Sequence, residues 1–448
     1  MACKDFSSTA FKCISIHDIG SAGCSANWKS YATASHQVCG IFWRSCPTAW
    51  TRHERILREI RKPNQGLAHR LMQCLVAAVR PLQVKELAEV LAFDFNAEGT
   101  PKLNQNWRWE DQEEAVMSAC SSLVAIVNDG DSRIVQFSHF SVKEFLTADR
   151  LVEPVRDVSP YHIELEAAHT ILAQACIGVL LRLGDHVDRD NIKEFPLAPY
   201  AGEHWPTHAK FGSVSARIKD GMERLFDEDK PHFATWLWIY IGFVTMRPEK
   251  PGSVPLLYAA SFGFRDLAAH LITEHPEHVN ARDISENTPM PAAVQGGNPD
   301  VISLLLEHDA DIDSRNQNGW TSLHCASSSG TLSVGKCLLD HGADINAREI
   351  DGWTPLYVCV LYATSEGLAS VEFAQMLLER GAMVDARDNS GRTSLHIAVE
   401  SARTRLARLL LEYGADVNAR DESGKTPFQY TTQQDILELL SGYGSESI

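Results

Sequence analysis

Residues 388–420 read DNSGRTSLHIAVESARTRLARLLLEYGADVNAR, and this stretch decides the fold. Its first five residues favour a tight turn, because Asn, Asp and Gly tolerate left-handed backbone. Thr393 can cap a short helix with its hydroxyl, and the leucines at 406 and 409–411 indicate a second helix. Gly414 is typical of a helix end. One such helix pair cannot bury its apolar face alone, so we expect copies of it to stack.

The same hairpin-and-two-helix pattern recurs along the C-terminal half of the chain. Aligning the Gly-x-Thr of each hairpin gives three units of 33 residues and a fourth with six more. A fixed period of this size indicates a stacked solenoid. The predicted units are 249–282, 283–315, 316–348, 349–387 and 388–420, with a polar C-terminal cap at 421–444.

Two of these units depart from the pattern. Pro291 stands where other units have His or Tyr, and the preceding Met290 is biased towards extended backbone. We therefore expect a less regular unit at 283–315. The six extra residues of 349–387 fall near 363–368, between its two predicted helices.

The repeated phrases resemble the ankyrin repeat. Thr-Pro-Leu-His-like openings and GADVNAR-like closings recur together at this period. The resemblance implies a solenoid that binds other proteins. It also implies that His324 and His396, which stand in the opening phrase, are structural and link neighbouring hairpins by hydrogen bonds.

Composition excludes some classes of protein. The chain has 448 residues and a formal net charge of −17, which disfavours binding to a phosphate backbone. Eleven scattered cysteines without a CxxC pair favour a reduced, cytoplasmic protein. No secretory signal is visible. The longest apolar stretch, 233–246, is shorter than the ~20 residues of a membrane span and predicts a buried helix.

Residues 1–50 show no clear periodicity, and we expect a poorly ordered segment. Cys24, His36, Cys39 and Cys46 suggest a zinc site, but their spacing matches no known ligand pattern. Ordinary unpaired thiols are the favoured interpretation.

The next residues predict a charged helix. Arginines recur there at every third position, with glutamates among them, and could form a basic strip for an acidic partner. A solvated face with internal ion pairs is the favoured alternative. The residues concerned are Arg52, Arg55, Arg58, Arg61, Glu54 and Glu59.

Residues 51–150 predict a winged-helix-like unit. Helices are expected near 67–79, 84–91 and 110–122, before two β-rich runs joined by Asn-Asp-Gly-Asp. A further helix is expected from Ser141. The helix before the hairpin would be the one to read DNA, but it begins Glu-Asp-Gln-Glu-Glu, which repels phosphates. A packing module is therefore favoured over DNA binding.

A second resemblance covers about residues 54–448. RLMQCLVAAVRPLQVKELAEVLAFDF (70–95), IVQFSHFSVKEFLTADRL (134–151) and AAHTILAQACIGVLLRL (167–183) resemble the segment that follows the NTPase core in fungal NACHT–ankyrin proteins. The resemblance implies a helical connector at 151–248 between the winged helix and the repeats. The fold class is thus mainly α: a winged-helix-like unit and a helical connector followed by an ankyrin-repeat solenoid.

No motif for nucleotide chemistry accompanies this resemblance. The nearest match to GxxxxGK[ST] is 419–426, with Ala419 at the first glycine position, acidic residues in the loop and no preceding strand. We interpret it as a repeat hairpin. The chain is expected to begin after the NTPase core, and the alternative function is a fragment of a signal-transducing NTPase.

Other catalytic or metal sites are also not favoured. His204, Trp205, His208 and His232 of the connector lack Glu or Cys at ligand spacing on one helix face, so core or capping roles are expected. No GxSxG or HExxH occurs. We expect a non-enzyme without cofactor or metal.

The predicted function is a protein-interaction scaffold that resembles the sensing region of a NACHT-type signalling protein. Specificity would lie in residues not needed for stacking, at hairpin tips and along inner helices. Trp320 and Trp353 could equally anchor a partner or pack on their own hairpins. A basic or mixed protein partner is favoured, with no nucleic acid. The candidate residues are Gln317, Asn318, Trp320, Ser328, Ser329, Ile350, Asp351, Trp353, Asn389, Ser390, Arg392 and Glu400.

Overall fold

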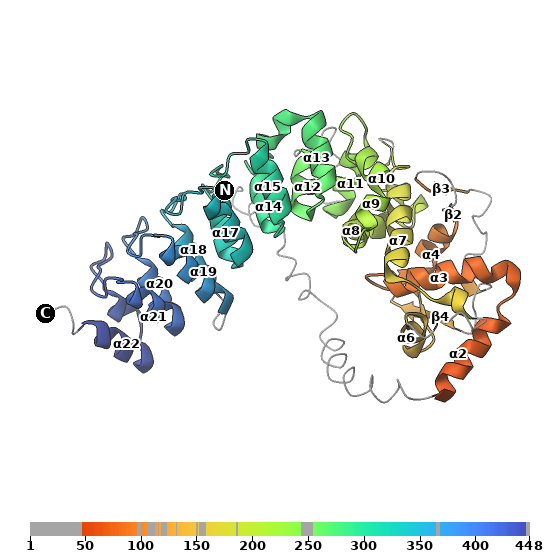
Figure 1. Cartoon of the computed structure of the whole chain (residues 1–448), viewed down its shortest axis with the longest axis horizontal. Helices are drawn as coiled ribbons and strands as arrows, with labels where there is room; N and C mark the ends of the chain where they lie inside the picture. Colours follow the sequence, from red (N-terminus) through yellow and green to blue (C-terminus); the bar gives the residue numbers. More distant parts are fainter. Residues whose placement is uncertain are drawn as a thin grey trace. The chain divides into compact units, whose positions relative to one another are not determined.

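The computed structural model describes residues 47–95, 100–104, 113–114, 116–117, 123–130, 132–148, 151, 158–184, 187–242, 254–363 and 368–444. The chain divides into two units, Met1–Pro251 and Gly252–Ile448 (Figure 1), and each is described by itself. The four zinc candidates Cys24, His36, Cys39 and Cys46 lie outside the described residues.

The first unit begins with a winged-helix arrangement. Strand β5 lies between β1 and β4 in an antiparallel sheet, and β4 pairs with β5 from Val124↔Phe137 to Asp129↔Ser132. The predicted hairpin is therefore confirmed. Its elements are α2 (Pro47–Glu59), α3 (Gln65–Ala77), β1 (Leu82–Gln83), α4 (Val84–Leu91), β4 (Val124–Asp129), β5 (Ser132–Phe137) and α6 (Ser141–Leu146), with a small sheet of β2 (Phe93–Asp94) and β3 (Lys102–Leu103).

For two predicted helices of this part, the structure describes only some of the residues concerned. Of the helix predicted at 110–122, residues 113–114 and 116–117 are described and are helical. In α2, Arg55 pairs with Glu59 and Arg58 with Glu54, each at 3.8 Å, as expected for a solvated face with internal ion pairs. The side chain of Arg52 lies outside the described residues.

A helical connector completes the first unit. Its core is aromatic: Trp205 is fully buried and its ring lies 5.8 Å from that of Trp236, whose indole N–H donates to the Gly202 carbonyl. Helix α11 confirms part of the buried helix predicted over 233–246: it ends at Tyr240, Ile241 is 44% exposed, and 243–246 lie outside the described residues. The connector helices are α7 (Leu165–Leu180), α8 (Ala198–Ala209), α9 (Val214–Arg217), α10 (Lys219–Leu225) and α11 (His232–Tyr240), with short 3-10 turns η5 (Ser159–Tyr161) and η6 (Ile192–Glu194).

The second unit is a two-layered stack of helix pairs (Figure 1). The inner helices contact one another in succession and are α12 (Pro255–Phe262), α14 (Pro289–Gln295), α16 (Ser322–Ser329), α18 (Pro355–Tyr362), α20 (Ser394–Glu400) and η8 (Pro427–Tyr430). The outer helices do the same and are α13 (Arg265–Glu274), α15 (Pro299–Glu307), α17 (Leu332–Asp340), α19 (Leu368–Glu379), α21 (Thr404–Glu412) and α22 (Gln434–Gly444), with η7 (Pro276–Asn280) after α13. The predicted solenoid and the mainly α fold class are confirmed.

The irregularity expected at 283–315 lies elsewhere than predicted. Met290 is not extended, because α14 begins at Pro289 and includes both Met290 and Pro291 in its buried first turn. The first N–H groups of a helix have no intrahelical partner, so prolines there lose little. One departure lies in the turn before α14, where Glu286 has a left-handed φ of 62° at a position that is glycine in the next four repeats. Another is Asp309, with φ of 60° at a position that is glycine in the next three repeats.

Within the part of the chain that the structure describes, no helix has both the length and the apolar character needed to cross a bilayer.

Candidate protein-binding surface

Histidines of the repeat phrase hold neighbouring hairpins together. The Nδ1 atom of His324 accepts from the Thr321 N–H at 3.2 Å, so the neutral ring carries its proton on Nε2. Nε2 then donates to the Trp353 carbonyl at 3.0 Å. His396 repeats this arrangement with Thr393 and with the carbonyl of Lys425 at 3.3 Å. The structural role predicted for both histidines is confirmed.

Burial keeps these rings neutral. His324 is fully buried, and burial lowers its pKa to about 4. The pKa of His396 is lowered for the same reason. A protonated Nδ1 could no longer accept from the threonine, so the neutral form is the one that fits the stack.

A ladder of arginines runs along the repeats. The Arg315 guanidinium donates to the Arg348 carbonyl at 2.5 Å, and Arg348 donates to the Arg387 carbonyl at 2.6 Å. Arg282 and Arg387 make the same bond to the arginines one repeat further on. Each rung joins two adjacent units through a charged donor, which strengthens the bond.

A second ladder uses Asp and Asn side chains. Asp313 accepts from the Asp344 N–H at 3.1 Å, and Asp385 accepts from the Asp416 N–H at 3.0 Å. Asn280 and Asn346 do the same for the following repeats. The two ladders and the histidines thus each join adjacent repeats by hydrogen bonds.

The hairpin tips are fastened by their backbones and leave their side chains exposed. Ile350 N–H donates to Asn318 O at 3.3 Å, and Asn389 N–H donates to Asp351 O at 2.9 Å. Six candidate residues occupy these tips with exposed side chains: Gln317, Asn318, Ile350, Asp351, Asn389 and Ser390. The Asn389 side chain also donates from Nδ2 to the Ile350 carbonyl at 2.8 Å, and the other five side chains are available to a partner.

Trp320 lies at the boundary between two repeats. Its ring is half-buried and meets Tyr362 of the next repeat edge-on, with centroids 5.9 Å apart. Tyr362 ends α18 and is 51% exposed. Trp320 also lies 6.1 Å from the ring of His324. Tyr362 was missed by sequence reasoning, although an aromatic residue at the end of an inner helix could have indicated it.

Trp353 is more closely tied to its own repeat. Its ring stacks on Tyr357 with centroids 5.6 Å apart and 12° between planes. The Tyr357 hydroxyl donates to Asp388 of the next hairpin at 2.8 Å, and burial raises the pKa of Tyr357. This tyrosine performs the hairpin-linking role that histidine has in other repeats.

The remaining candidates are partly engaged within the chain. Arg392 pairs with Asp388 at 3.2 Å and with Glu400 at 3.4 Å. The hydroxyls of Ser328 and Ser329 donate to backbone carbonyls of α16. We call the inner face the surface formed by the exposed hairpin tips and the exposed ends of α14, α16, α18 and α20. It includes Trp320 and Tyr362.

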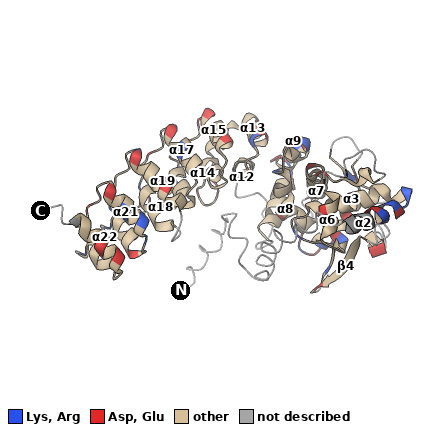
Figure 2. Cartoon of the chain, turned by 60° about the horizontal axis from the view of Figure 1, so that its bottom comes forward, with Lys and Arg blue, Asp and Glu red and all other residues tan. Residues whose placement is uncertain are grey.

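Negative charge dominates the second unit. Residues 252–448 contain 27 Asp and Glu against 13 Lys and Arg. Figure 2 shows acidic residues recurring at one end of the outer helices, where four of them end in Glu307, Asp340, Glu379 and Glu412. An acidic surface favours basic partners.

The connector histidines form a buried network rather than a cluster of ligands. His208 is fully buried; its Nδ1 lies 2.8 Å from Nδ1 of His169, and its Nε2 lies 2.9 Å from the Tyr200 hydroxyl. Burial lowers the pKa of His208 to about 3. His204 and His232 do not join this chain of hydrogen bonds; His232 donates to the Leu183 carbonyl instead.

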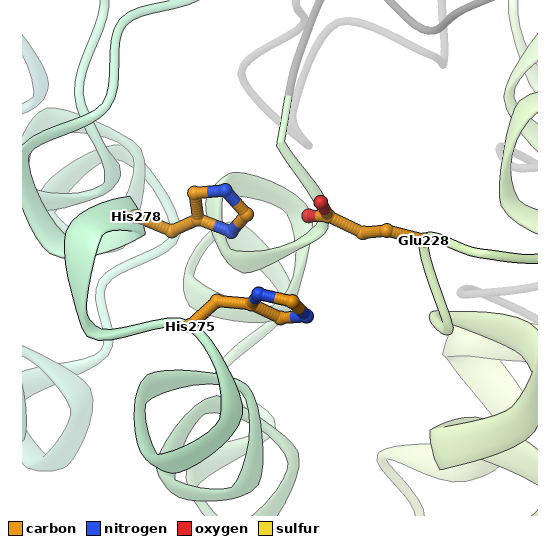
Figure 3. A group of neighbouring side chains, drawn as sticks. All are labelled: Glu228, His275 and His278. Carbon is orange, nitrogen blue, oxygen red and sulfur yellow. The ribbon is translucent and has the colours of Figure 1, made fainter.

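His275 and His278 stack in the second unit, with centroids 5.0 Å apart (Figure 3). Glu228, also drawn there, belongs to the first unit. Within either described unit taken alone, no three His, Cys, Asp or Glu side chains converge as metal ligands do.

Comparison with known families agrees with these two parts of the fold. Residues 256–349 and 347–421 match ankyrin repeats, and residues 55–155 match the winged helix domain of GPI inositol-deacylase. A curated relative is "Azaphilone pigments biosynthesis cluster protein L" of Monascus ruber, 32% identical over 278 residues. The match covers 56% of this chain and 57% of that protein, so it spans little more than half of each. The predicted ankyrin repeats and winged-helix domain are thereby confirmed.

Proposed function

We propose that this chain is a non-catalytic scaffold that binds a protein partner on its inner face. The observation that carries the proposal is the edge-on contact of Trp320 with Tyr362, two partly exposed rings from adjacent repeats. Exposed aromatic side chains of this kind are the usual anchors of protein interfaces.

Stacking alone does not require these rings. The position of Trp320 is Asn287, Arg392 or Lys425 in other repeats, and the position of Tyr362 is Gly296, Ser329 or Ser401 there and Phe262 only in the first unit. Those repeats form the same helix pairs. The rings at 320 and 362 are therefore available for recognition, whereas Trp353, stacked on Tyr357, has a larger part in packing.

Substitutions taken from sibling repeats provide the test. Trp320→Asn with Tyr362→Ser removes both rings while keeping residues that the stack already accommodates elsewhere. Tyr413→His, an exposed position on the outer helices where three other repeats have His, is the matched control. Affinity purification of the full chain from its own cell extract should recover a partner with wild type and with the control, but not with the double variant. Equal recovery with all three, at unchanged melting temperature, would reject the inner face.

A finer form of the proposal concerns the setting of this scaffold. The order of a winged-helix domain, a helical connector and ankyrin repeats supports a role as the sensing arm of a NACHT-type signalling protein, or as a fragment of such an NTPase. The name of the Monascus ruber relative associates that protein with a pigment biosynthesis cluster. Purified chain should show no saturable binding of magnesium-ATP by calorimetry, and saturable binding would overturn the non-catalytic assignment.

A further inference from the structure

The residue that follows each turn glycine sets the chemistry of the inner face repeat by repeat. In the last two repeats it is a cation: Arg392 pairs with Asp388 and Glu400, and Lys425 Nζ lies 5.6 Å from the centre of the Tyr430 ring. These repeats thus supply a cation to their own acidic and aromatic groups.

In units 316–348 and 349–387 the same position is tryptophan. Among the residues that the structure describes, no Lys or Arg lies over Trp320, Trp353 or Tyr362. Aromatic rings elsewhere in the chain do have such a neighbour, as Tyr200 has in Arg80 at 4.9 Å. The faces of these rings are where a cation from outside would be attracted.

The adjoining tip carries an exposed carboxylate, and the cation of the same hairpin, Arg348, donates to the Arg387 carbonyl instead of pairing with it. Asp351 is exposed and makes no ion pair with any described residue. Glu349 of the same hairpin is buried, accepts from the Trp353 N–H at 2.9 Å, and has its pKa raised by burial, with Asp351 also acting to raise it. The tip is bonded to the hairpin of Trp320 through Ile350 N–H and Asn318 O. The rings and the carboxylates therefore share one repeat boundary.

From this juxtaposition we propose that the boundary between units 316–348 and 349–387 binds a basic segment of the protein partner. A Lys or Arg of that segment lies against Trp320 and Tyr362, and a second basic residue pairs with Asp351. The inference rests on the proposed function and names the chemistry of the partner. Residues 252–448 contain 27 acidic and 13 basic residues. This net negative charge also favours a basic segment, because it attracts a basic segment and repels an acidic one.

A photo-crosslinking amino acid placed at Gln317 tests separately the proposed scaffold function and the inference that the partner's bound segment is basic. Gln317 is an exposed tip residue beside the boundary, and Tyr413 on the outer helices is the control position. After illumination of the full chain in its own cells, mass spectrometry identifies the crosslinked peptide. A segment with two or more Lys or Arg, captured from Gln317 and not from Tyr413, supports the inference. A captured segment without Lys or Arg overturns the inference and leaves the scaffold function standing. No capture from Gln317 overturns both.

A binding series with the captured segment as a synthetic peptide then tests the roles of single residues. Asp351→Asn places the residue that unit 316–348 has at its own tip, and it should weaken binding to the full chain about 2- to 5-fold, the range expected for an exposed ion pair. Trp320→Arg, which mimics Arg392, should weaken binding more than Trp320→Asn, because it adds a like charge. Equal affinity for these two variants, or no effect of Asp351→Asn, would reject a cation at this boundary.

Discussion

The Nε2 atom of His324 lies 3.0 Å from the carbonyl oxygen of Trp353, so a buried side chain of one repeat holds the hairpin of the next. The same ring caps its own helix through Thr321. A single neutral imidazole therefore both caps its own helix and holds the hairpin of the next repeat. Protonation of this ring is expected to weaken both contacts.

Stability is expected to decrease as pH falls below about 6.5. Burial lowers the pKa of His324 to about 4, so between these values the unfolded chain binds a proton that the folded chain does not. The contribution of the neutral ring is complete above pH 6.5 and is lost as pH falls towards 4, with a total of about 3 kcal/mol. Urea unfolding of the full chain at pH 7.5, 6.0 and 5.0 measures how the free energy of unfolding changes with pH.

His324→Gln is the matched variant for this pH dependence. Gln429 occupies the same position in the last hairpin and caps Thr426 at 2.9 Å without titrating. The variant should lose less stability between pH 6.5 and 5.0 than the wild type. A slope identical to that of the wild type would contradict the role given to His324.

Arg348→Ala is expected to destabilise the repeats by about 1–2 kcal/mol, because it removes a charged donor from a backbone carbonyl between two units. Arg380→Ala is the comparison, since Arg380 forms an exposed ion pair with Asp340 at 2.7 Å, and exposed pairs contribute at most about 1 kcal/mol. If both variants lose the same free energy of unfolding in urea, the arginine ladder stabilises the repeats no more than an exposed ion pair does.

Ala402→Gly is expected to stabilise the chain by about 0.5–1 kcal/mol. Ala402 has φ of 56° where other repeats have Gly297 and Gly330, and a Cβ in left-handed backbone is strained. Ala398→Gly, inside the buried helix α20, should instead destabilise, since glycine weakens a helix interior. Thermal unfolding compares the two. A lower melting temperature for Ala402→Gly would argue against strain at this residue.

Gly391→Ala should destabilise the stack more than Gly424→Ala. Both glycines are left-handed, at φ of 77° and 78°, so both substitutions introduce backbone strain of about 1–2 kcal/mol. A Cβ at Gly391 would also lie 2.9 Å from the Glu422 backbone nitrogen, whereas none at Gly424 meets a neighbour within 4 Å. The denaturant midpoint of Gly391→Ala should therefore be lower than that of Gly424→Ala. Equal midpoints would mean that the contact with the Glu422 backbone adds no loss of stability.

The hairpin glycines and helix leucines of 388–420 can be interpreted from sequence because their roles are local. A turn that needs φ near 77° selects Gly391, and an apolar stripe at helical spacing selects leucines such as Leu406 and Leu410. Where a local preference meets a tertiary demand, the sequence misleads: Met290 precedes a proline, yet burial in the stack places it in a helix. The roles of His324 and His396 came from the resemblance, because their partners are a full repeat away.

The sequence alone determined the repeat period, the helix pairs, the winged-helix hairpin and the candidate tip residues, since each depends on neighbours within a few positions. Only the tertiary structure decided which of those residues meet. Tyr362 touches Trp320 from 42 positions away, and Arg348 reaches a carbonyl 39 positions along the chain. Such distances close only when one repeat stacks on the next, and that stacking joins the aromatic pair with the acidic tip at one boundary.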